Sequence, residues 1–278
     1  MHVHAGPDLV GRAMDVVELG LAANQAGMAG LVLKDHALPT TGQAYVLNQT
    51  LGGSCRFYGS VVLNPATGGI NSALVKAALG HGAAMVFLPT YGAAHHYHLT
   101  GSRPHYPYSE KHPLGMDLRN RGNHGELLAI FEAIACSDAI LATGHISPEE
   151  CLWVINAAQS AGVRRIVVTH ASMPRIGLPL DAQEEAVKLG AYIEHSFVAC
   201  TGILHAPIQV ETMREQIAHV GAEHCLLSSD LGQKSNGSPI AGFSRFLTKL
   251  MDTGISSEEI KQMTATNPAK LLANCNAP

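Results

Sequence analysis

The sequence has 278 residues, close to the roughly 250 residues of a single (β/α)8 barrel. Hydrophobic residues make up 46%, charged residues only 14%, and the net charge is −4. This composition excludes a disordered chain and argues against a basic nucleic-acid-binding surface. The 16 histidines are the unusual feature, because they are almost as numerous as the 18 lysines and arginines together.

Several other protein classes are disfavoured by simple sequence features. No run of about 18 apolar residues is present, so we expect no transmembrane helix and no membrane partner. The N-terminus lacks the layout of a signal peptide, and the six cysteines form no C-x-x-C pair, so we expect a cytoplasmic protein with reduced thiols. The low charged fraction favours a homo-oligomer that hides part of its surface.

Short apolar runs recur along the chain and are predicted to be parallel strands, because they are apolar on both faces. After a first strand at His2–His4 they are Gly30–Leu33, Tyr58–Leu63, Ala84–Leu88, Ala139–Ala142, Arg165–Val168, Ala191–Ile193 and Cys225–Leu227.

Helical patterns occur between these runs. The predicted helices are Asp8–Ala26, Pro148–Ala161, Asp181–Leu189, Pro207–Val220, Ser256–Met263 and Asn267–Ala273. Eight strand–helix units predict an α/β fold with one domain over residues 1–278, a (β/α)8 TIM-like barrel with a truncated first strand. A doubly wound open sheet is the rival fold, but no G-x-G-x-x-G follows the first strand.

A long loop is predicted after the fourth strand, at residues 91–124. This segment is rich in Gly, Pro, His and Tyr, has no clear period, and contains prolines that we expect to prevent helix formation. Long ordered loops are usually lids or binding loops. We therefore predict a lid in which Tyr91, His95, Arg103 or Arg119 reaches the substrate, with a subunit contact or adventitious metal binding as the alternatives.

Histidines and one aspartate fall at the ends of the predicted strands. His2 and His4 share one face of the first strand, because they are two residues apart. Carboxyl ends of barrel strands converge on one mouth, where active sites are built. Imidazole and carboxylate ligands suit zinc, manganese, iron or nickel, so we predict one or two divalent metal ions, with zinc preferred. The remaining strand-end residues are His36, His145, His170, His195 and Asp230, and Glu194 directly precedes His195 at the end of the seventh strand.

The order of these residues resembles the amidohydrolase superfamily of metal-dependent hydrolases over the whole chain. Within it, the segment Leu33–His36 looks like that of a small, poorly characterised group, and Thr266–Leu272 looks like the closing helix. The resemblance implies two ligand sets: His2, His4 and Asp230 for a first metal, and His145 and His170 for a second.

Two features depart from the superfamily pattern. Many binuclear members bridge the metals with a carboxylated lysine or a glutamate after strand four, where this chain has Phe87, Leu88, Pro89 and Thr90. Lys34, after strand two, is either a carboxylated bridging ligand or an ammonium that binds a substrate carboxylate. Only Met1 precedes the His-x-His motif, so either the first strand is short or the native reading frame starts upstream.

These residues predict a hydrolase that cleaves an amide, cyclic amide, ester or lactone of a small molecule with a metal-activated water. Asp230 is the expected general acid/base. His195 binds substrate, acts as a second acid/base or has a packing role. His36 binds substrate, is a further metal ligand or orients Lys34 or Asp230. The alternatives are a metal-dependent decarboxylase, a phosphoesterase, and a binding protein without catalytic activity.

Overall fold

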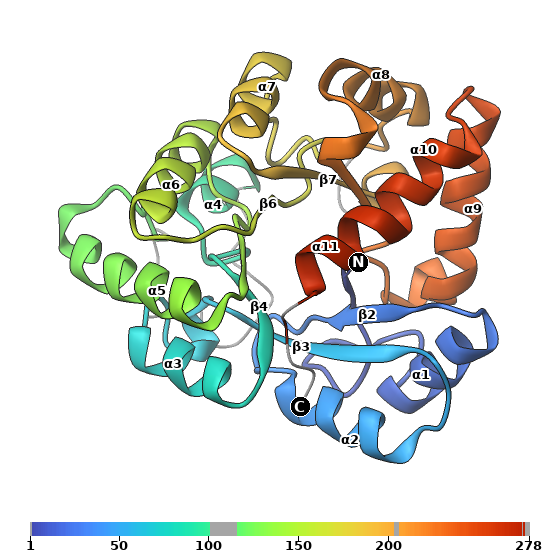
Figure 1. Ribbon diagram of the computed structural model, residues 1–278, viewed down its shortest axis with the longest axis horizontal. Helices are drawn as coiled ribbons and strands as arrows, with labels where there is room; N and C mark the ends of the chain where they lie inside the picture. The colour runs from blue at the N-terminus through green and yellow to red at the C-terminus, as the bar shows by residue number, and fades with distance from the viewer. Residues whose placement is uncertain (1, 101–115, 203–205, 274, 276–278) are drawn as a thin grey trace.

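The computed structural model describes residues 2–100, 116–202, 206–273 and 275 (Figure 1). Eight parallel strands form one sheet, and each strand is hydrogen-bonded to the next in chain order. They are β1 (His2–Val3), β2 (Gly30–Leu33), β3 (Arg56–Val62), β4 (Ala83–Phe87), β5 (Ile140–Ala142), β6 (Ile166–Val168), β7 (Tyr192–Ser196) and β8 (Cys225–Ser228).

The two edge strands meet and nearly close the sheet. The backbone N–H of His4 donates to Leu231 O (2.8 Å), and the N–H of Asp230 donates to His2 O (3.3 Å). The predicted (β/α)8 barrel is therefore confirmed. The closing bonds also bring the end of the first strand beside the end of the last.

Apolar side chains on both faces of the strands explain why the sheet is buried on both sides. In β4, Met85 and Phe87 belong to a cluster inside the barrel, whereas Val86 belongs to the layer between strands and helices. Leu271 packs into the inner cluster from the C-terminal helix. The barrel interior is thus filled with apolar side chains, and buried histidine, lysine and carboxylate side chains gather at its carboxyl end.

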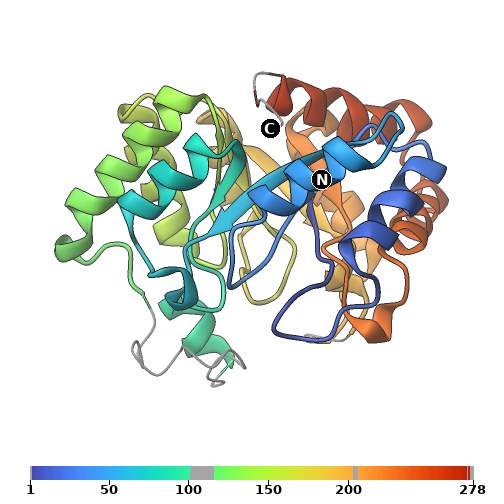
Figure 2. The ribbon, with the colours of Figure 1, turned by 90° about the horizontal axis from the view of Figure 1, so that it is seen from below.

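Helices surround the barrel (Figure 1). Within the described residues, no helix is long and apolar enough to span a membrane. Figure 2 shows α4 at one end of the barrel and the last two helices at the other. The helices are α1 (Val16–Gln25), α2 (Thr41–Thr50), α3 (Ser72–Gly80), α4 (Ala94–Thr100), α5 (His124–Ser137), α6 (Pro148–Ser160), α7 (Leu180–Lys188), α8 (Val210–Val220), α9 (Pro239–Asp252), α10 (Ser257–Lys261) and α11 (Asn267–Leu272).

The first helix is shorter than predicted. It begins at Val16 because Asp15 caps the backbone N–H groups of Val17 and Glu18, and Glu18 in turn accepts from the N–H of Asp15. The preceding residues form a loop in which Arg12 is paired with Asp8. The prediction of a helix from Asp8 was therefore wrong over its first two turns.

The prediction that residues 91–124 contain no helix was also wrong. Residues 94–100 form α4, and residues 101–115, with the candidate Arg103, lie outside the described part of the chain. Three of the prolines used in that prediction lie within 101–115, whereas 94–100 contains none. Two hydrogen bonds join the ends of this β4–α5 excursion: Ala94 N–H donates to Met116 O (3.0 Å), and Met116 N–H donates to Gly92 O (2.7 Å).

Gly144, which precedes His145, has a backbone conformation that other residues rarely adopt. Its φ is 68°, and an added Cβ would clash with the carbonyl groups of Leu88 and Pro89. We expect Gly144→Ala to lower the free energy of unfolding by about 2 kcal/mol or more. Chemical denaturation measures this change. Gly42→Ala is the matched control, since that glycine lies in α2 with open space around it, and an equal loss in both variants would contradict the explanation.

Candidate metal centre

Asp230 lies at the centre of a buried cluster at the carboxyl ends of the strands. The other members of the cluster are His2, His4, Lys34, His170 and Glu194. Oδ1 of Asp230 is 2.9 Å from His2 Nε2 and 3.0 Å from His4 Nε2, and Oδ2 of Asp230 is 3.7 Å from His170 Nδ1. His2, His170 and Asp230 offer ligand atoms that all lie within 4.8 Å of one another. The structure therefore brings together side chains that sequence reasoning placed on three different strands.

Two members of the cluster have left-handed backbones. His170 has φ 57° and Asp230 has φ 49°, and neither is a glycine. Such conformations cost on the order of 1 kcal/mol or more and are concentrated at functional sites. His170 is further held by a hydrogen bond between its Nδ1 and Ser196 Oγ (3.1 Å).

Glu194 supports His2 on the side away from Asp230. The N–H at His2 Nδ1 donates to Glu194 Oε1 (2.8 Å), and the hydroxyl of Ser228 donates to the same oxygen (2.9 Å). With its proton on Nδ1, His2 turns the Nε2 lone pair toward Asp230 Oδ1. That contact is favourable only when a proton or a cation lies between the two atoms. A carboxylate behind a histidine is also the usual partner of a metal-binding imidazole.

Arg12 approaches His4 from the β1–α1 loop. Its Nη2 lies 3.4 Å from His4 Nδ1, and its Nε donates to Asp8 Oδ2 (2.7 Å). Because a guanidinium can only donate, Nδ1 of His4 accepts and Nε2 carries the proton that is donated to Asp230. Ligation through His4 Nε2 would require this proton to leave and the long Arg12 contact to be released.

Lys34 extends from the end of β2 toward Asp230. Its Nζ is 3.9 Å from Asp230 Oδ1 and 4.8 Å from the centre of the Phe87 ring. Phe87 is the last residue of β4, so Lys34 reaches across the mouth of the barrel to the end of that strand. Burial lowers the pKa of the Lys34 ammonium, although Asp230 and Glu194 oppose that shift.

The two carboxylates of the cluster are ionised. Burial alone would raise the pKa of Asp230, but electrostatic interactions with Lys34, His170 and His2 outweigh burial and hold this pKa well below its usual value. Burial likewise acts to raise the pKa of Glu194, and the charge and hydrogen bond of His2 hold it at about 2. Both groups are therefore acceptors at neutral pH.

The histidines of the cluster differ in their protonation. Burial lowers the pKa of His4 to about 3, with a further contribution from Arg12, and burial lowers that of His170 to about 3. Burial also acts to lower the pKa of His2, but Glu194 and Asp230 outweigh it and raise this pKa above 6.5. The ring of His2 lies between Glu194 and Asp230. When His2 carries a second proton, on Nε2, that proton lies between the ring and Asp230 Oδ1, where a cation would also be favoured.

Three polar atoms around Asp230 are buried without a hydrogen-bond partner in the described residues: Lys34 Nζ, His170 Nε2 and Glu194 Oε2. Each such atom costs about 1–3 kcal/mol when it stays unsatisfied. Neutral imidazoles and carboxylates are a donor set that holds divalent metal ions. The residues of the cluster therefore fit a metal ion, which would provide a partner for some of these atoms.

Other predicted residues border the cluster. The ring of His145 lies 5.2 Å from that of His170, centre to centre, and 5.8 Å from that of Tyr91. The ring of His36 stacks on His4 at 4.7 Å and lies 4.4 Å from Tyr91. Burial lowers the pKa values of His36 and His145 well below 6.5, and it raises that of Tyr91 to about 12. A neutral rim of imidazole and phenol groups thus lies beside Asp230.

Three predicted substrate-binding residues are not brought to the cluster by described contacts. His195 turns away from Glu194 because adjacent strand residues face opposite sides. Its Nδ1 bonds Ser172 Oγ (2.6 Å), whose hydroxyl donates to Gln216 of α8. Arg119 is exposed, and its backbone N–H donates to Asp117 Oδ1 (2.9 Å). His95 is half-buried on α4 and has a buried Nε2 without a hydrogen-bond partner in the described residues.

Sequence reasoning missed three residues at the site: Arg12, His96 and Glu194. His96, rather than the neighbouring His95, contacts the cluster through His145. Glu194 was recognised at a strand end but was not assigned a role. A carboxylate near a strand end is a candidate partner for a strand-end histidine, and this signal could have indicated Glu194 as the partner of His2. Which residue of β7 faces His2, however, depends on the register of that strand.

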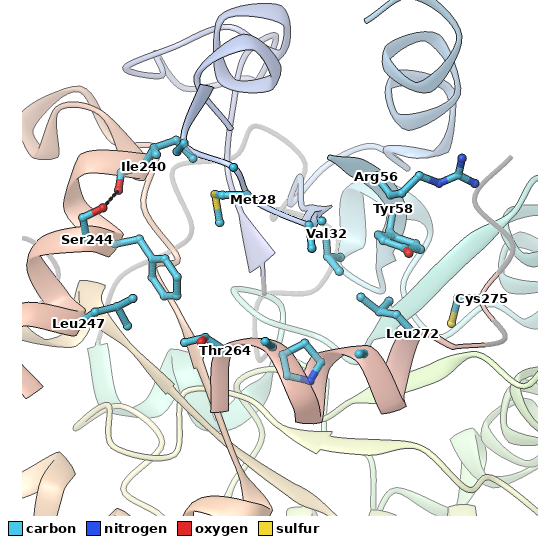
Figure 3. A pocket seen from close by; sticks show the side chains of 18 of the residues that line it. Met28, Val32, Arg56, Tyr58, Ile240, Ser244, Leu247, Thr264, Leu272 and Cys275 are labelled. Carbon is cyan, nitrogen blue, oxygen red and sulfur yellow. Dashed lines mark hydrogen bonds between the residues drawn. The ribbon is translucent and has the colours of Figure 1, made fainter. Parts of the chain in front are cut away.

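A separate pocket of about 820 Å³ opens at the opposite end of the barrel (Figure 3). It includes Gly30 and Arg56, which begin β2 and β3, so it lies at the amino ends of the strands. Phe243 of α9 and Leu272 of α11 supply part of its apolar wall. Among the described residues, its lining contains no histidine, aspartate or glutamate, and it contributes nothing to the predicted metal centre.

Fold and site together define a (β/α)8 barrel with a histidine–carboxylate cluster at its carboxyl end. Within this class, the chain belongs to DUF6282, a family of unknown function whose model matches residues 1–194. The match covers β1 to β6 and part of β7, and so includes every cluster residue except Asp230. Among curated proteins, none matches the sequence.

Solved structures share the fold. Organophosphorus hydrolase from Deinococcus radiodurans is 15% identical, with a TM-score of 0.62 over 92% of this chain and 82% of that one. A variant of an organophosphorus hydrolase is 16% identical, with a TM-score of 0.65 over 97% and 91%. A third structure, described as organophosphate hydrolysis activity engineered from a weak promiscuous lactonase, is 15% identical, with a TM-score of 0.62 over 92% and 84%.

Proposed function

We propose that this chain is a metal-dependent hydrolase of the amidohydrolase type, acting on a small molecule. The observation that carries the proposal is the convergence of His2, His170 and Asp230, with Glu194 behind His2. The bond cleaved is an ester or lactone, with an amide or cyclic amide as the other candidates. The similarity of the barrel to structures named as hydrolases, one of them built on a lactonase, supports the ester or lactone assignment.

Five residues would hold the metal. His2, His4 and Asp230 form the first ligand set, and His145 and His170 form the second. Zinc is the preferred ion for this nitrogen and oxygen donor set, and manganese, iron or nickel would also be accepted. When bound, the metal would lower the pKa of water toward about 7 and polarise a carbonyl oxygen.

Asp230 would accept a proton from the attacking water and return it to the leaving group. Its carboxylate is ionised at neutral pH, and Lys34, His2 and His170 surround it. Proton transfer by a positioned side chain contributes typically about 10²- to 10⁴-fold to a rate. His36 and Tyr91 lie at the rim of the cluster and would bind substrate there.

Lys34 would act in one of two ways. Burial lowers its pKa and so raises the fraction of the neutral amine, the form that would react with carbon dioxide to give a carbamate and a proton; the carbamate would offer oxygen ligands beside Asp230. As an ammonium it would bind a carboxylate of the substrate instead. The position of Nζ, buried and 3.9 Å from Asp230 Oδ1, supports a role at the reacting centre in both cases.

Hydrolysis of a phosphoester is the second candidate, because two of the similar structures are named as organophosphorus hydrolases. Arg12, which was not among the predicted site residues, places a cationic side chain next to His4. A decarboxylase on the same barrel is the third candidate. A cytoplasmic location and a homo-oligomeric state stay predictions from the sequence.

The test is a hydrolysis assay on full-length protein purified without chelator, with metal content measured in parallel. The panel contains lactones, aryl esters, lactams, hydantoins, acyl amino acids and phosphotriesters. We expect one or two metal equivalents, turnover of an ester or lactone, loss of turnover on chelation, and recovery with zinc or manganese. Protein that binds no metal, or turnover that survives complete metal removal, would overturn the proposal. Release of carbon dioxide would favour the decarboxylase.

A further inference from the structure

His96 is a buried histidine that neither the sequence motifs nor the proposed ligand sets include. It lies in α4, in the excursion between β4 and α5, and only 2% of it is exposed. Its Nδ1 is 2.9 Å from Nδ1 of His145, and the two ring planes are 23° apart. A side chain from outside the barrel strands therefore hydrogen-bonds directly to a proposed metal ligand.

We propose that His96 is a positioning residue that fixes the orientation and the tautomer of His145 for metal binding through Nε2. The inference rests on the proposed metal centre, since it assigns a role to the neighbour of one of its ligands. Metal-binding histidines almost always donate their second ring N–H to a fixed acceptor. For His145, that acceptor is an imidazole nitrogen instead of a carboxylate or a carbonyl.

The geometry leaves one arrangement compatible with ligation through Nε2. At 2.9 Å, one of the two Nδ1 atoms must donate and the other must accept. A neutral imidazole that offers Nε2 to a metal carries its proton on Nδ1, so His145 donates and His96 accepts. His96 then carries its own proton on Nε2.

The surroundings of the pair hold both rings in place. Tyr91 packs edge-on against His96 at 5.1 Å and against His145 at 5.8 Å, with interplanar angles of 82° and 87°. The backbone N–H of His145 donates to Pro89 O (2.9 Å). Because both rings are buried, little water is available to replace a lost partner, and removal of His96 would leave the Nδ1–H of His145 unsatisfied.

Hydrogen bonds hold both ends of α4 in place. Its first residue, Ala94, donates its N–H to Met116 O (3.0 Å), so the start of the helix is tied to the chain that returns toward α5. The hydroxyl of Thr100 donates to His96 O (2.9 Å), which fixes the backbone of His96 as well. The described part of the excursion thus acts as a support for the metal centre, in addition to any covering role.

The test measures binding of Co²⁺ to the metal-free full chain, by calorimetry and by the visible absorption of the bound ion. His145→Ala first identifies which metal equivalent depends on His145. His96→Leu is expected to weaken that same equivalent by about 10- to 100-fold and to change its absorption spectrum. His96→Asn is expected to restore most of the affinity, because an asparagine oxygen can accept at the position of Nδ1. His98→Asn, an exposed neighbour on α4, is the matched control.

The outcomes separate the inference from the proposed function. Wild-type protein that binds no Co²⁺ would overturn the metal centre and the inference with it. Loss of an equivalent in His145→Ala with wild-type binding in His96→Leu would overturn the inference alone. Loss in both His96 variants, with no rescue by asparagine, would make His96 a direct ligand and would also overturn the positioning role. In the double variant His96→Leu with His145→Ala, we expect no loss beyond that of His145→Ala.

Discussion

Replacement of Asp230 by asparagine is expected to lower kcat/KM for the best ester or lactone substrate by about 10²- to 10⁴-fold. Asparagine has nearly the size of aspartate and keeps an oxygen near His2 and His4. Its amide cannot accept a proton from water, so the substitution removes the acid/base step more than it disturbs packing. Steady-state kinetics on metal-loaded protein, with metal content determined on the same sample, measures the effect.

The matched control for Asp230→Asn is Asp252→Asn, at the exposed end of α9, which we expect to leave both kinetics and metal content unchanged. Unchanged turnover in Asp230→Asn with metal still bound would remove Asp230 from the mechanism. A low metal content that accounts for the whole loss of turnover would assign Asp230 a ligand role without an acid/base role.

The main part of the cluster was predictable from sequence because of where its residues fall relative to apolar strands. His2 lies in β1, and His170 and Asp230 lie two residues after the ends of β6 and β8. Parallel strands in a barrel place such positions at one mouth. No side-chain contact is needed for that argument. The same argument placed Lys34 and His145 near the mouth, although not the distances between them.

The roles of Glu194 and His195 could not be separated from sequence. In a half-exposed strand, alternation of polar and apolar residues shows which side chain faces the core. The strands of this barrel are apolar on both faces, so Ile193 gives no such signal. The strand was also predicted to end at Ile193, whereas β7 continues to Ser196. Only the register of β7 on β8 decides that Glu194 faces His2.

The contribution of His96 was not predictable either. Residues 91–124 have no helical period, and three prolines lie between residues 104 and 113. A helix of seven residues such as α4 is not stable by itself, and it forms here through contacts with the barrel and with Met116. Which of the adjacent histidines His95 and His96 faces inward depends on how that short helix packs, and sequence patterns carry no information about it.

The metal-free protein is expected to lose stability steeply as the pH falls below 6.5. Burial holds the pKa of His4 and His170 at about 3 and that of His195 at about 4, whereas in the unfolded chain each has its ordinary value of 6.5. Between these values only the unfolded chain binds the proton, so each histidine costs up to about 1.4 kcal/mol per pH unit. His2, with its raised pKa, is protonated in both states and adds no slope there. Urea unfolding between about pH 7.5 and 5 measures the slope.

His195→Gln isolates one of these titrations, because His195 lies outside the cluster and bonds Ser172. Glutamine can still donate to that hydroxyl but does not titrate, so the slope of unfolding free energy against pH should fall by up to about 1.4 kcal/mol per pH unit. His81→Gln, at an exposed position, should leave the slope unchanged. Equal slopes in wild type and His195→Gln would mean that burial does not keep His195 neutral. Since slopes are compared, a loss of stability that is the same at every pH does not affect the conclusion.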